Sequence, residues 1–227
     1  MAEDFTLCLE GRLLVHHSSR EPWLHVGRGR ERMEMYRGNF TIEDHVIERV
    51  PLPHLTRRGT RLEFRRHPAD EVQLAVEAES GSDRAILRFV EADPRINRLW
   101  LRLPAEPDEH VWGCGEQMSY LDLRGRRFPL WTSEPGVGRD KSTYITFQAD
   151  VAGRAGGDYY HTNYPQPTFL SSRRYMAHVE TTAYAEFDFR DTDCHELQVW
   201  AVPQALELTV ADDLLGLVEK ASLRFGR

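Results

Sequence analysis

Acidic side chains that stand close together in the sequence could act as the acid and the base of a catalytic reaction. Asp212 and Asp213 are adjacent, and Glu186 and Asp188 are separated by one residue. Two catalytic carboxyl groups must reach the same reacting bond, at a separation that the mechanism sets. The first pair precedes an apolar pattern of helical spacing, and the second alternates with apolar residues. We therefore interpret the first pair as a helix cap and the second as a solvent-facing strand surface.

Cys194, His195 and Glu196 have the residue types of a nucleophile, a base and an orienting acid. Neighbouring residues of a strand point to opposite faces, so these three cannot converge on one atom without help from elsewhere. The other cysteines, Cys8 and Cys114, are far away in sequence, and the ten histidines lack metal-ligand spacing. The sequence therefore predicts no catalytic residue of this kind, no metal site and no cofactor.

Glycine, proline and tryptophan are concentrated between His110 and Arg139. This segment contains five glycines, two prolines and two tryptophans in thirty residues. Gly113 and Gly115 flank Cys114, and glycine permits backbone angles and close approaches that a side chain forbids. The composition predicts a shaped loop system and not a core strand.

Two short motifs in this segment resemble landmarks of a known enzyme family. WGCGE (112–116) is similar to the Tyr-Gly-x-Gly-Glu landmark of glycoside hydrolase family 31, and LWTSE (130–134) is similar to its Leu-Trp-Asn-x-Asp landmark. Both landmarks lie in the N-terminal domain of that family. Residues 33–45, 116–150 and 155–175 resemble the sulfoquinovosidase branch of these alpha-glucosidase-like enzymes. The resemblance covers nearly the whole chain.

The resemblance implies the N-terminal β-sandwich of a retaining alpha-glycosidase, of the sulfoquinovosidase or alpha-glucosidase type, which hydrolyses O-glycosyl bonds. Family 31 takes both catalytic aspartates from a (β/α)8 barrel, and the residues of the sulfonate site also lie in that barrel. These residues would all follow Arg227, the last residue here. The resemblance therefore implies a catalytic barrel as the partner, and we expect the chain to be inactive alone.

In family 31 a loop of this domain reaches over the mouth of the barrel and helps to shape the substrate pocket. The corresponding loop here is 130–141, in which Glu134 takes the place of an aspartate that hydrogen-bonds sugar hydroxyls in many relatives. Arg139 is a candidate partner for an anionic sugar or for Glu134 itself. Trp131 offers a flat apolar face to a sugar ring, and burial in packing is the alternative. The expected substrate-binding residues are therefore Glu134, Arg139 and Trp131.

Two further features of the loops have a structural interpretation. Glu116 and Gln117 follow the glycine motif, and we expect them to brace a loop beside the barrel more than to bind substrate. Tyr159, Tyr160 and Tyr164 belong to a second aromatic loop, which we expect to pack against the barrel. An exposed aromatic surface is therefore expected in this chain.

Composition excludes several classes of function. The 227 residues include 29 basic and 36 acidic side chains, and the net charge of −7 opposes binding to nucleic acid. The early acidic residues and the lack of 18 consecutive apolar residues predict neither a signal peptide nor a membrane span. Together with three widely spaced cysteines, this predicts a soluble cytoplasmic protein.

Apolar and polar residues alternate along most of the remaining chain, which is the period of a β-strand. Gly38 and Asn39 mark a turn between two such runs, and the segment 143–149 returns to alternation after the loop. The sequence therefore predicts an all-β fold, an antiparallel β-sandwich that the resemblance identifies with the galactose-mutarotase-like supersandwich.

Helical spacing appears convincingly only near the C-terminus. Asp212 or Asp213 can cap a short helix in which Leu214, Leu217 and Val218 share a face. We expect a sandwich domain over 1–211 and a helix over 212–227 that leads towards the absent barrel.

Two other classes of protein remain open. A stand-alone carbohydrate-binding module would bind sugar without a barrel and would keep a polar loop face around one aromatic platform. A structural subunit would dock noncovalently onto a separately encoded barrel. A severed domain would instead expose a broad apolar patch.

Overall fold

A computed structural model of the chain describes residues 3–36, 39–134 and 136–226. Within these residues the protein is an all-β sandwich with two helices, as the alternation predicts. The first eight strands are β1 (Phe5–Leu9), β2 (Arg12–His17), β3 (Leu24–Tyr36), β4 (Asn39–Pro51), β5 (His54–Arg58), β6 (Arg61–Arg65), β7 (Leu74–Ser80) and β8 (Arg84–Ala92). The others are β9 (Arg98–Pro104), β10 (Val111–Gly115), β11 (Arg127–Leu130), β12 (Pro165–Ser171), β13 (Tyr175–Glu180), β14 (Ala185–Asp188), β15 (Cys194–Val199) and β16 (Ala205–Val210). The helices are α1 (Tyr144–Gly153) and α2 (Leu214–Phe225).

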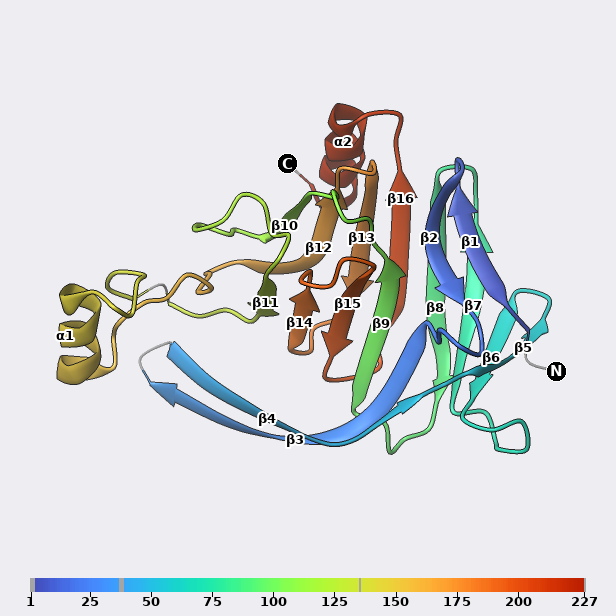
Figure 1. Cartoon of the computed structure of the whole chain (residues 1–227), viewed down its shortest axis with the longest axis horizontal. Coiled ribbons are helices and arrows are strands. Elements are labelled where there is room, and N and C mark those ends of the chain that lie inside the picture. Colours follow the sequence, from blue (N-terminus) through green and yellow to red (C-terminus); the bar gives the residue numbers. More distant parts are fainter. Residues whose placement is uncertain (1–2, 37–38, 135, 227) are drawn as a thin grey trace.

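Two antiparallel sheets form the sandwich. The larger has the order β10-β12-β13-β16-β8-β7-β6-β5, the smaller has the order β11-β14-β15-β9-β3-β4, and β1 pairs with β2 beside them (Figure 1). Inward side chains such as Leu101, Phe169, Phe187 and Leu208 are fully buried in one continuous core. The sandwich is therefore stabilised by apolar side chains from both inner faces.

The expected C-terminal helix is confirmed. Asp213 caps α2, because its side chain accepts a hydrogen bond from the backbone amide of Gly216 at 2.8 Å. Leu217 is buried against Met176 of β13, so α2 covers the outer surface of the larger sheet.

Two predictions about local structure are wrong. The segment 143–149 was expected to be a strand, but α1 begins at Tyr144. The segment has too few apolar residues to distinguish the period of a strand from that of a helix. Its backbone hydrogen bonds are local, and Phe147 N donates to Thr143 O. The segment 110–139 was expected to contain no core strand, yet β10 and β11 pair within the two sheets. Val111 and Cys114 of β10 and Phe128 and Leu130 of β11 are buried in the core, although glycine and proline lie between them.

Strands β3 and β4 continue beyond the sheet as a long two-stranded ribbon (Figure 1). β3 pairs with β9 only from Leu24 to Gly27, so the outer parts of β3 and β4 pair only with each other within the described chain. The turn expected at Gly38 lies outside the described residues. The ribbon is thus an extension whose direction must be fixed by other contacts.

Arg98 of β9 provides these contacts. Its side chain is 2% exposed and donates to Glu31 Oε2 of β3 at 2.8 Å and to Asp44 Oδ1 of β4 at 2.9 Å. The guanidinium also lies 4.2 Å from the ring centre of Trp200. A Cβ on Gly29 would lie 2.8 Å from Arg98 Nε, so glycine allows the ribbon to approach this closely.

We expect Arg98→Met to lower the free energy of unfolding by about 3 kcal/mol, because the acidic pair of the ribbon loses its buried cation. Arg28→Met is the matched control, because Arg28 contacts Glu48 at 2.9 Å in an exposed ion pair. The control should change stability by less than about 1 kcal/mol. Urea unfolding of both variants measures the difference, and equal losses would contradict the role of Arg98.

Candidate functional site

Trp131 follows β11 and lies at the junction of the loop, the ribbon and the smaller sheet. Its ring packs edge-on against Phe40 of β4 at 5.8 Å and tilted against Tyr184 at 6.0 Å between ring centres. Its indole Nε1 is buried and has no hydrogen-bond partner among the described residues. Trp131 is half-buried, so it both packs and presents part of its ring.

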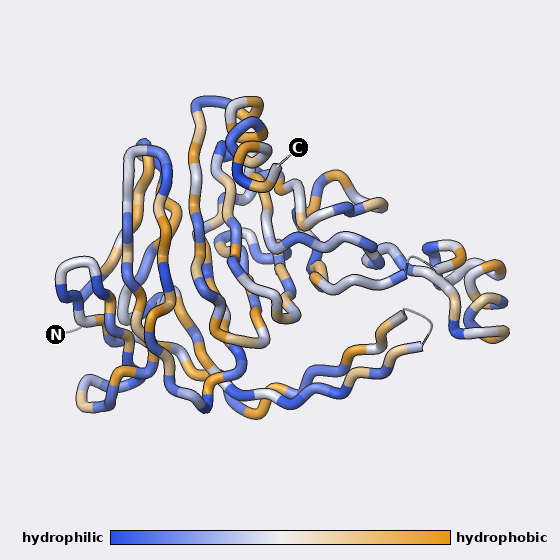
Figure 2. The backbone as a smooth tube through the Cα atoms, turned by 180° about the vertical axis from the view of Figure 1, so that it is seen from behind, coloured by the Kyte–Doolittle hydropathy of each residue, from blue (hydrophilic) through white to orange (hydrophobic). Residues whose placement is uncertain are grey.

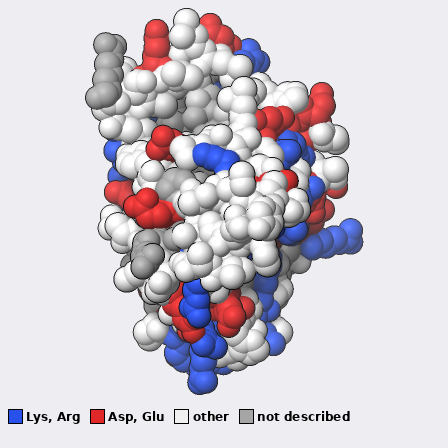
Figure 3. All heavy atoms as spheres, turned by 90° about the vertical axis from the view of Figure 1, so that its left-hand side faces the viewer, with Lys and Arg blue, Asp and Glu red and all other residues white. Residues whose placement is uncertain are grey.

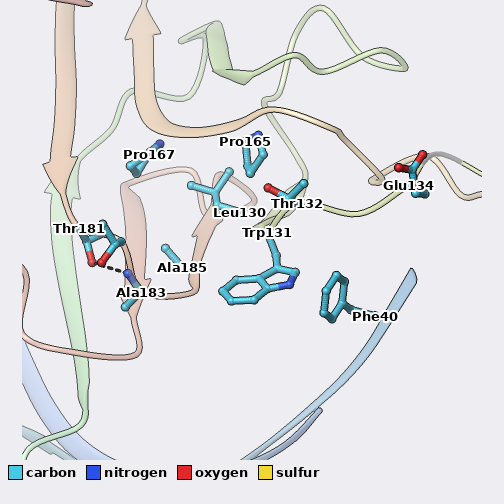
Figure 4. Close-up of a pocket in the computed structure, with 11 residues that line it drawn as sticks. Phe40, Leu130, Trp131, Thr132, Glu134, Pro165, Pro167, Thr181, Ala183 and Ala185 are labelled. Carbon is cyan, nitrogen blue, oxygen red and sulfur yellow. Dashed lines mark hydrogen bonds between the residues drawn. The ribbon is translucent and has the colours of Figure 1, made fainter. Parts of the chain in front are cut away.

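A pocket of about 490 Å³ opens beside this tryptophan. Trp131 and Phe40 form one wall, and Glu134 lies at the far end of the pocket from Ala183 (Figure 4). The pocket is lined by Phe40, Leu130, Trp131, Thr132, Glu134, Pro165, Pro167, Thr181, Thr182, Ala183 and Ala185. An apolar floor with a few hydroxyl groups and one carboxylate can hold a sugar-like or mixed apolar ligand.

Sequence reasoning missed most of this lining. Phe40 lies in the matched segment 33–45 but was expected only to pack in a hairpin, and the turn 181–183 carries no motif. They reach the pocket through the bend of the ribbon and the pairing of β11 with β14. Of the two prolines of β12, Pro165 lies at the end of the expected aromatic loop and Pro167 follows it, and neither was expected to line a pocket.

Arg139 does not line this pocket. Its Nη1 donates to Ser119 Oγ at 2.6 Å, which joins the loop to the preceding segment. The structure therefore brings Trp131 and Glu134 to one pocket and gives Arg139 a bracing contact beside it.

The loop that carries Glu134 is closed by α1. Val137 N donates to Ala155 O at 2.7 Å, and Gly157 N donates to Val137 O at 3.0 Å, so the segments before and after α1 are joined. Gly138 has a φ of +68°, and a Cβ there would lie 2.2 Å from Oγ1 of the buried Thr146. Helix α1 therefore positions the loop through a contact that only glycine permits.

Lys141 strengthens this closure. Its Nζ donates to Asp150 Oδ2 at 3.0 Å and to Gly156 O at 2.8 Å. Asp150 Oδ1 also accepts from Gly156 N at 2.9 Å, and these bonds to Lys141 and Gly156 hold the pKa of Asp150 below its ordinary value. One lysine and one aspartate thus join both ends of α1 to the loop.

The expected bracing at Glu116 is made by its backbone. Glu116 N donates to Tyr164 O at 2.9 Å, and its carbonyl oxygen accepts from Thr162 Oγ1 at 2.6 Å. Gln117 Nε2 donates to Cys114 O at 3.0 Å. These bonds hold the end of β10 against the segment that leads into β12.

The second aromatic loop is partly packed and partly exposed. Tyr160 packs against Phe128 of β11 at 5.3 Å between ring centres. Tyr164 and Tyr159 are exposed. An aromatic surface therefore lies next to the loop of Glu134, as expected.

His195 faces the core and interacts with an acid far away in sequence. Its Nε2 lies 3.1 Å from Oε1 of Glu109, and both side chains are fully buried. Ser171 Oγ donates to the same carboxylate at 2.5 Å. Burial favours the neutral form of Glu109, but the bonds from His195 and Ser171 outweigh it and lower the pKa of this carboxyl group. Since the cluster is enclosed, we interpret it as structural.

The carboxylate pairs lie in the settings that the sequence suggests. Glu186 binds Arg127, and Asp188 binds Arg190 at 2.6 Å on the outer face of the smaller sheet. Among the described residues no three His, Cys, Asp or Glu side chains form a cluster suited to a metal ion. Neither described helix is long and apolar enough to cross a membrane.

Fold and site together define an all-β sandwich domain with a pocket that residues of its strands and connecting segments line. No protein-family model matches the chain. A sulfoquinovosidase of Agrobacterium fabrum is 54% identical over 225 residues, which are 99% of this chain and 33% of the relative. A sulfoquinovosidase of Escherichia coli is 42% identical over 229 residues, which are 99% of this chain and 34% of the relative.

A solved structure gives the same result. The family 31 sulfoquinovosidase of E. rectale, in complex with an aza-sugar inhibitor, superposes with a TM-score of 0.92 and is 45% identical. The match covers all of this chain and 34% of that one. The chain thus spans about a third of the sulfoquinovosidases that it matches, and the resemblance to the sulfoquinovosidase branch of glycoside hydrolase family 31 is confirmed.

We expect Gly138→Ala to displace α1 from the loop, because the new methyl group would overlap Thr146. Hydrogen exchange at the α1 amides should accelerate by about tenfold or more, since the helix has few other contacts. Gly125→Ala is the control, because Gly125 also has a positive φ, of +77°, but open space around it. Unchanged exchange in Gly138→Ala would show that α1 does not depend on this contact.

Stability should depend on pH through Glu109. Its pKa is lower in the folded protein than in the unfolded chain, so its ionised form stabilises the fold above the unfolded value and this contribution is lost as the pH falls. Between about pH 5 and pH 3, Glu109→Gln should therefore lose less stability than the unmodified protein. Urea unfolding at several pH values tests this, with Glu106→Gln as the exposed control. The same slope in both variants would contradict it.

Proposed function

We propose that the chain is the N-terminal, non-catalytic β-sandwich part of a retaining alpha-glycosidase that hydrolyses O-glycosyl bonds of sulfoquinovosides or alpha-glucosides. One observation carries the proposal: 54% identity to a sulfoquinovosidase extends across 99% of the chain. The TM-score of 0.92 to a second such enzyme supports the same assignment for the fold.

In this proposal the loop 130–141 contributes to the substrate pocket of the assembled enzyme. Glu134 accepts hydrogen bonds from sugar hydroxyls, and Trp131 supports a ring from its exposed side. Arg139 either contacts an anionic substituent directly or holds the loop through Ser119. The pocket next to Trp131 supports these roles, because it contains an apolar wall and a carboxylate.

The partner in this proposal is a (β/α)8 barrel that supplies the two catalytic aspartates. The chain needs no cofactor for this role. Cys8, Cys114 and Cys194 are all free thiols, which supports a reducing, cytoplasmic location.

A stand-alone carbohydrate-binding module is the second candidate. The pocket of about 490 Å³ favours it, because this pocket is already formed in the chain alone. Titration calorimetry of the chain with sulfoquinovose and with methyl alpha-glucoside separates the two functions. Saturable binding by the chain alone would favour the module.

The assembled enzyme can be tested with a chimera. This chain would replace the matched third of the Agrobacterium fabrum sulfoquinovosidase, from which it differs in fewer than half of the aligned residues. We expect the chimera to hydrolyse a nitrophenyl sulfoquinovoside and the chain alone to show no turnover. A folded but inactive chimera would contradict the proposed function.

Within the active chimera, Glu134→Gln should lower kcat/KM by about 10- to 100-fold, because a charge-assisted hydrogen bond to the sugar becomes a weaker neutral one. Glu79→Gln is the control, since this glutamate is exposed and pairs with Arg88 on another strand. If both variants retained the activity of the parent chimera, Glu134 would have no role in substrate binding.

A further inference from the structure

The β3–β4 ribbon has one apolar face and one polar face. Pairing sets Met33 opposite Ile42 and Met35 opposite Phe40, and side chains alternate between the faces of a strand. The inner face of the ribbon carries the apolar residues Met33, Met35, Phe40, Ile42 and Val46, together with the acidic pair Glu31 and Asp44. The opposite face carries one aromatic residue, Tyr36, and otherwise the polar residues Arg30, Arg32, Glu34, Thr41, Glu43 and His45. The ribbon is therefore amphipathic, as the alternating colours along it indicate (Figure 2).

Three of the apolar side chains of the inner face are exposed, whereas Phe40 and Ile42 are half-buried. Met33 is 41% exposed, Met35 is 64% exposed and Val46 is 42% exposed. A two-stranded ribbon without a third strand or a packed face is marginally stable in water. Methionine side chains adapt their shape and are common on surfaces that bind other proteins. The inner face thus has the composition of a surface that another polypeptide covers.

This face belongs to a concave surface. Glu31 and Asp44, which share the inner side of the ribbon, bind Arg98 of the smaller sheet, and Phe40 contacts Trp131. The ribbon therefore curves towards the outer side of that sheet, below β11 and β14 (Figure 1). Helix α1 lies beyond the described ends of β3 and β4 (Figure 1), and the view of this end shows broad uncharged areas between scattered charges (Figure 3).

We propose that the inner face of the ribbon is the docking surface for the part of a sulfoquinovosidase-like enzyme that this chain does not include. About two thirds of each matched relative lies outside the matched region, so a large polypeptide is available to cover it. A second copy fits less well, because a two-fold interface joins a surface to itself and two concave surfaces leave a gap. This inference rests on the proposed function.

The surface of the occupant must be convex and apolar. Exposed helices of a compact domain have this shape, and their Leu, Ile and aromatic side chains complement flexible methionines. Docking here also places the occupant next to Phe40 and Trp131, and hence next to the pocket of Glu134. One contact would therefore both cover the ribbon and fix its tip at the pocket.

Hydrogen exchange in the chimera described above tests the proposal. The amides of 28–36 and 39–48 are compared between the isolated chain and the chimera, where we expect them to be protected about tenfold or more. Met33→Lys with Met35→Lys should abolish this gain in protection. Glu34→Gln with Thr41→Lys is the matched control, because it also raises the net charge by two but alters the opposite face. Both pairs are exposed, so neither should unfold the sandwich.

The outcomes separate this inference from the proposed function. Protection that is gained in the chimera, lost in the methionine variant and kept in the control supports the docking surface, even if the chimera proves inactive. Equal exchange in the active chimera and in the isolated chain overturns the docking surface and leaves the proposed function intact. Protection that persists in the methionine variant also overturns it.

Sedimentation velocity of the isolated chain tests the alternative occupant. A monomer over the micromolar range agrees with the proposal. Self-association that Met33→Lys with Met35→Lys abolishes, and the control does not, would show that a second copy is the occupant and would refute the proposal.

Discussion

The buried cation of Arg98 connects the sandwich to everything that extends from it. Removing a guanidinium from water is costly, and the two carboxylates, the carbonyl oxygen of Asn97 and the ring of Trp200 offset that cost. Because these acids come from β3 and β4, the favourable geometry exists only when the ribbon bends over the sheet. The direction of the ribbon is thus coupled to the burial of one charge, and the position of Phe40 at the pocket follows from that direction.

The loop of Glu134 is fixed by a different and more local means. Arg139, Lys141 and Asp150 make polar contacts with neighbouring segments, and Gly138 lets Thr146 approach. Few apolar side chains of the loop are buried, so its order depends on hydrogen bonds that water can replace. The ribbon and the loop therefore meet at Trp131 but are stabilised differently. A buried ion pair stabilises the ribbon, and surface hydrogen bonds stabilise the loop.

Much of the fold could be predicted from the sequence because alternation reports directly which side chains are buried. The strands of the core follow this alternation, and α2 follows a capping aspartate and apolar residues at helical spacing. Helix α1 could not be predicted, because its ten residues are apolar on several sides and only Thr146 is buried. Strands β10 and β11 were hidden because glycine and proline interrupt them. Trp131 and Glu134 were found through the motif 130–134, whereas Phe40 reaches the pocket through the bend at Arg98, which no local pattern encodes.

The outer sides of the two sheets carry different features. The outer side of the larger sheet is partly covered by α2, which packs on β13 through Leu217. The smaller sheet carries the ribbon, the buried Arg98, the aromatic contacts of Trp131 and most of the pocket, to which β12 of the larger sheet adds two prolines. These features depend on one another. Arg98 holds the ribbon in its bent direction, and this direction places Phe40 in the wall of the pocket and orients the inner face. A partner that docks on that face would therefore contact Phe40, whose ring packs against Trp131 in the wall of the pocket.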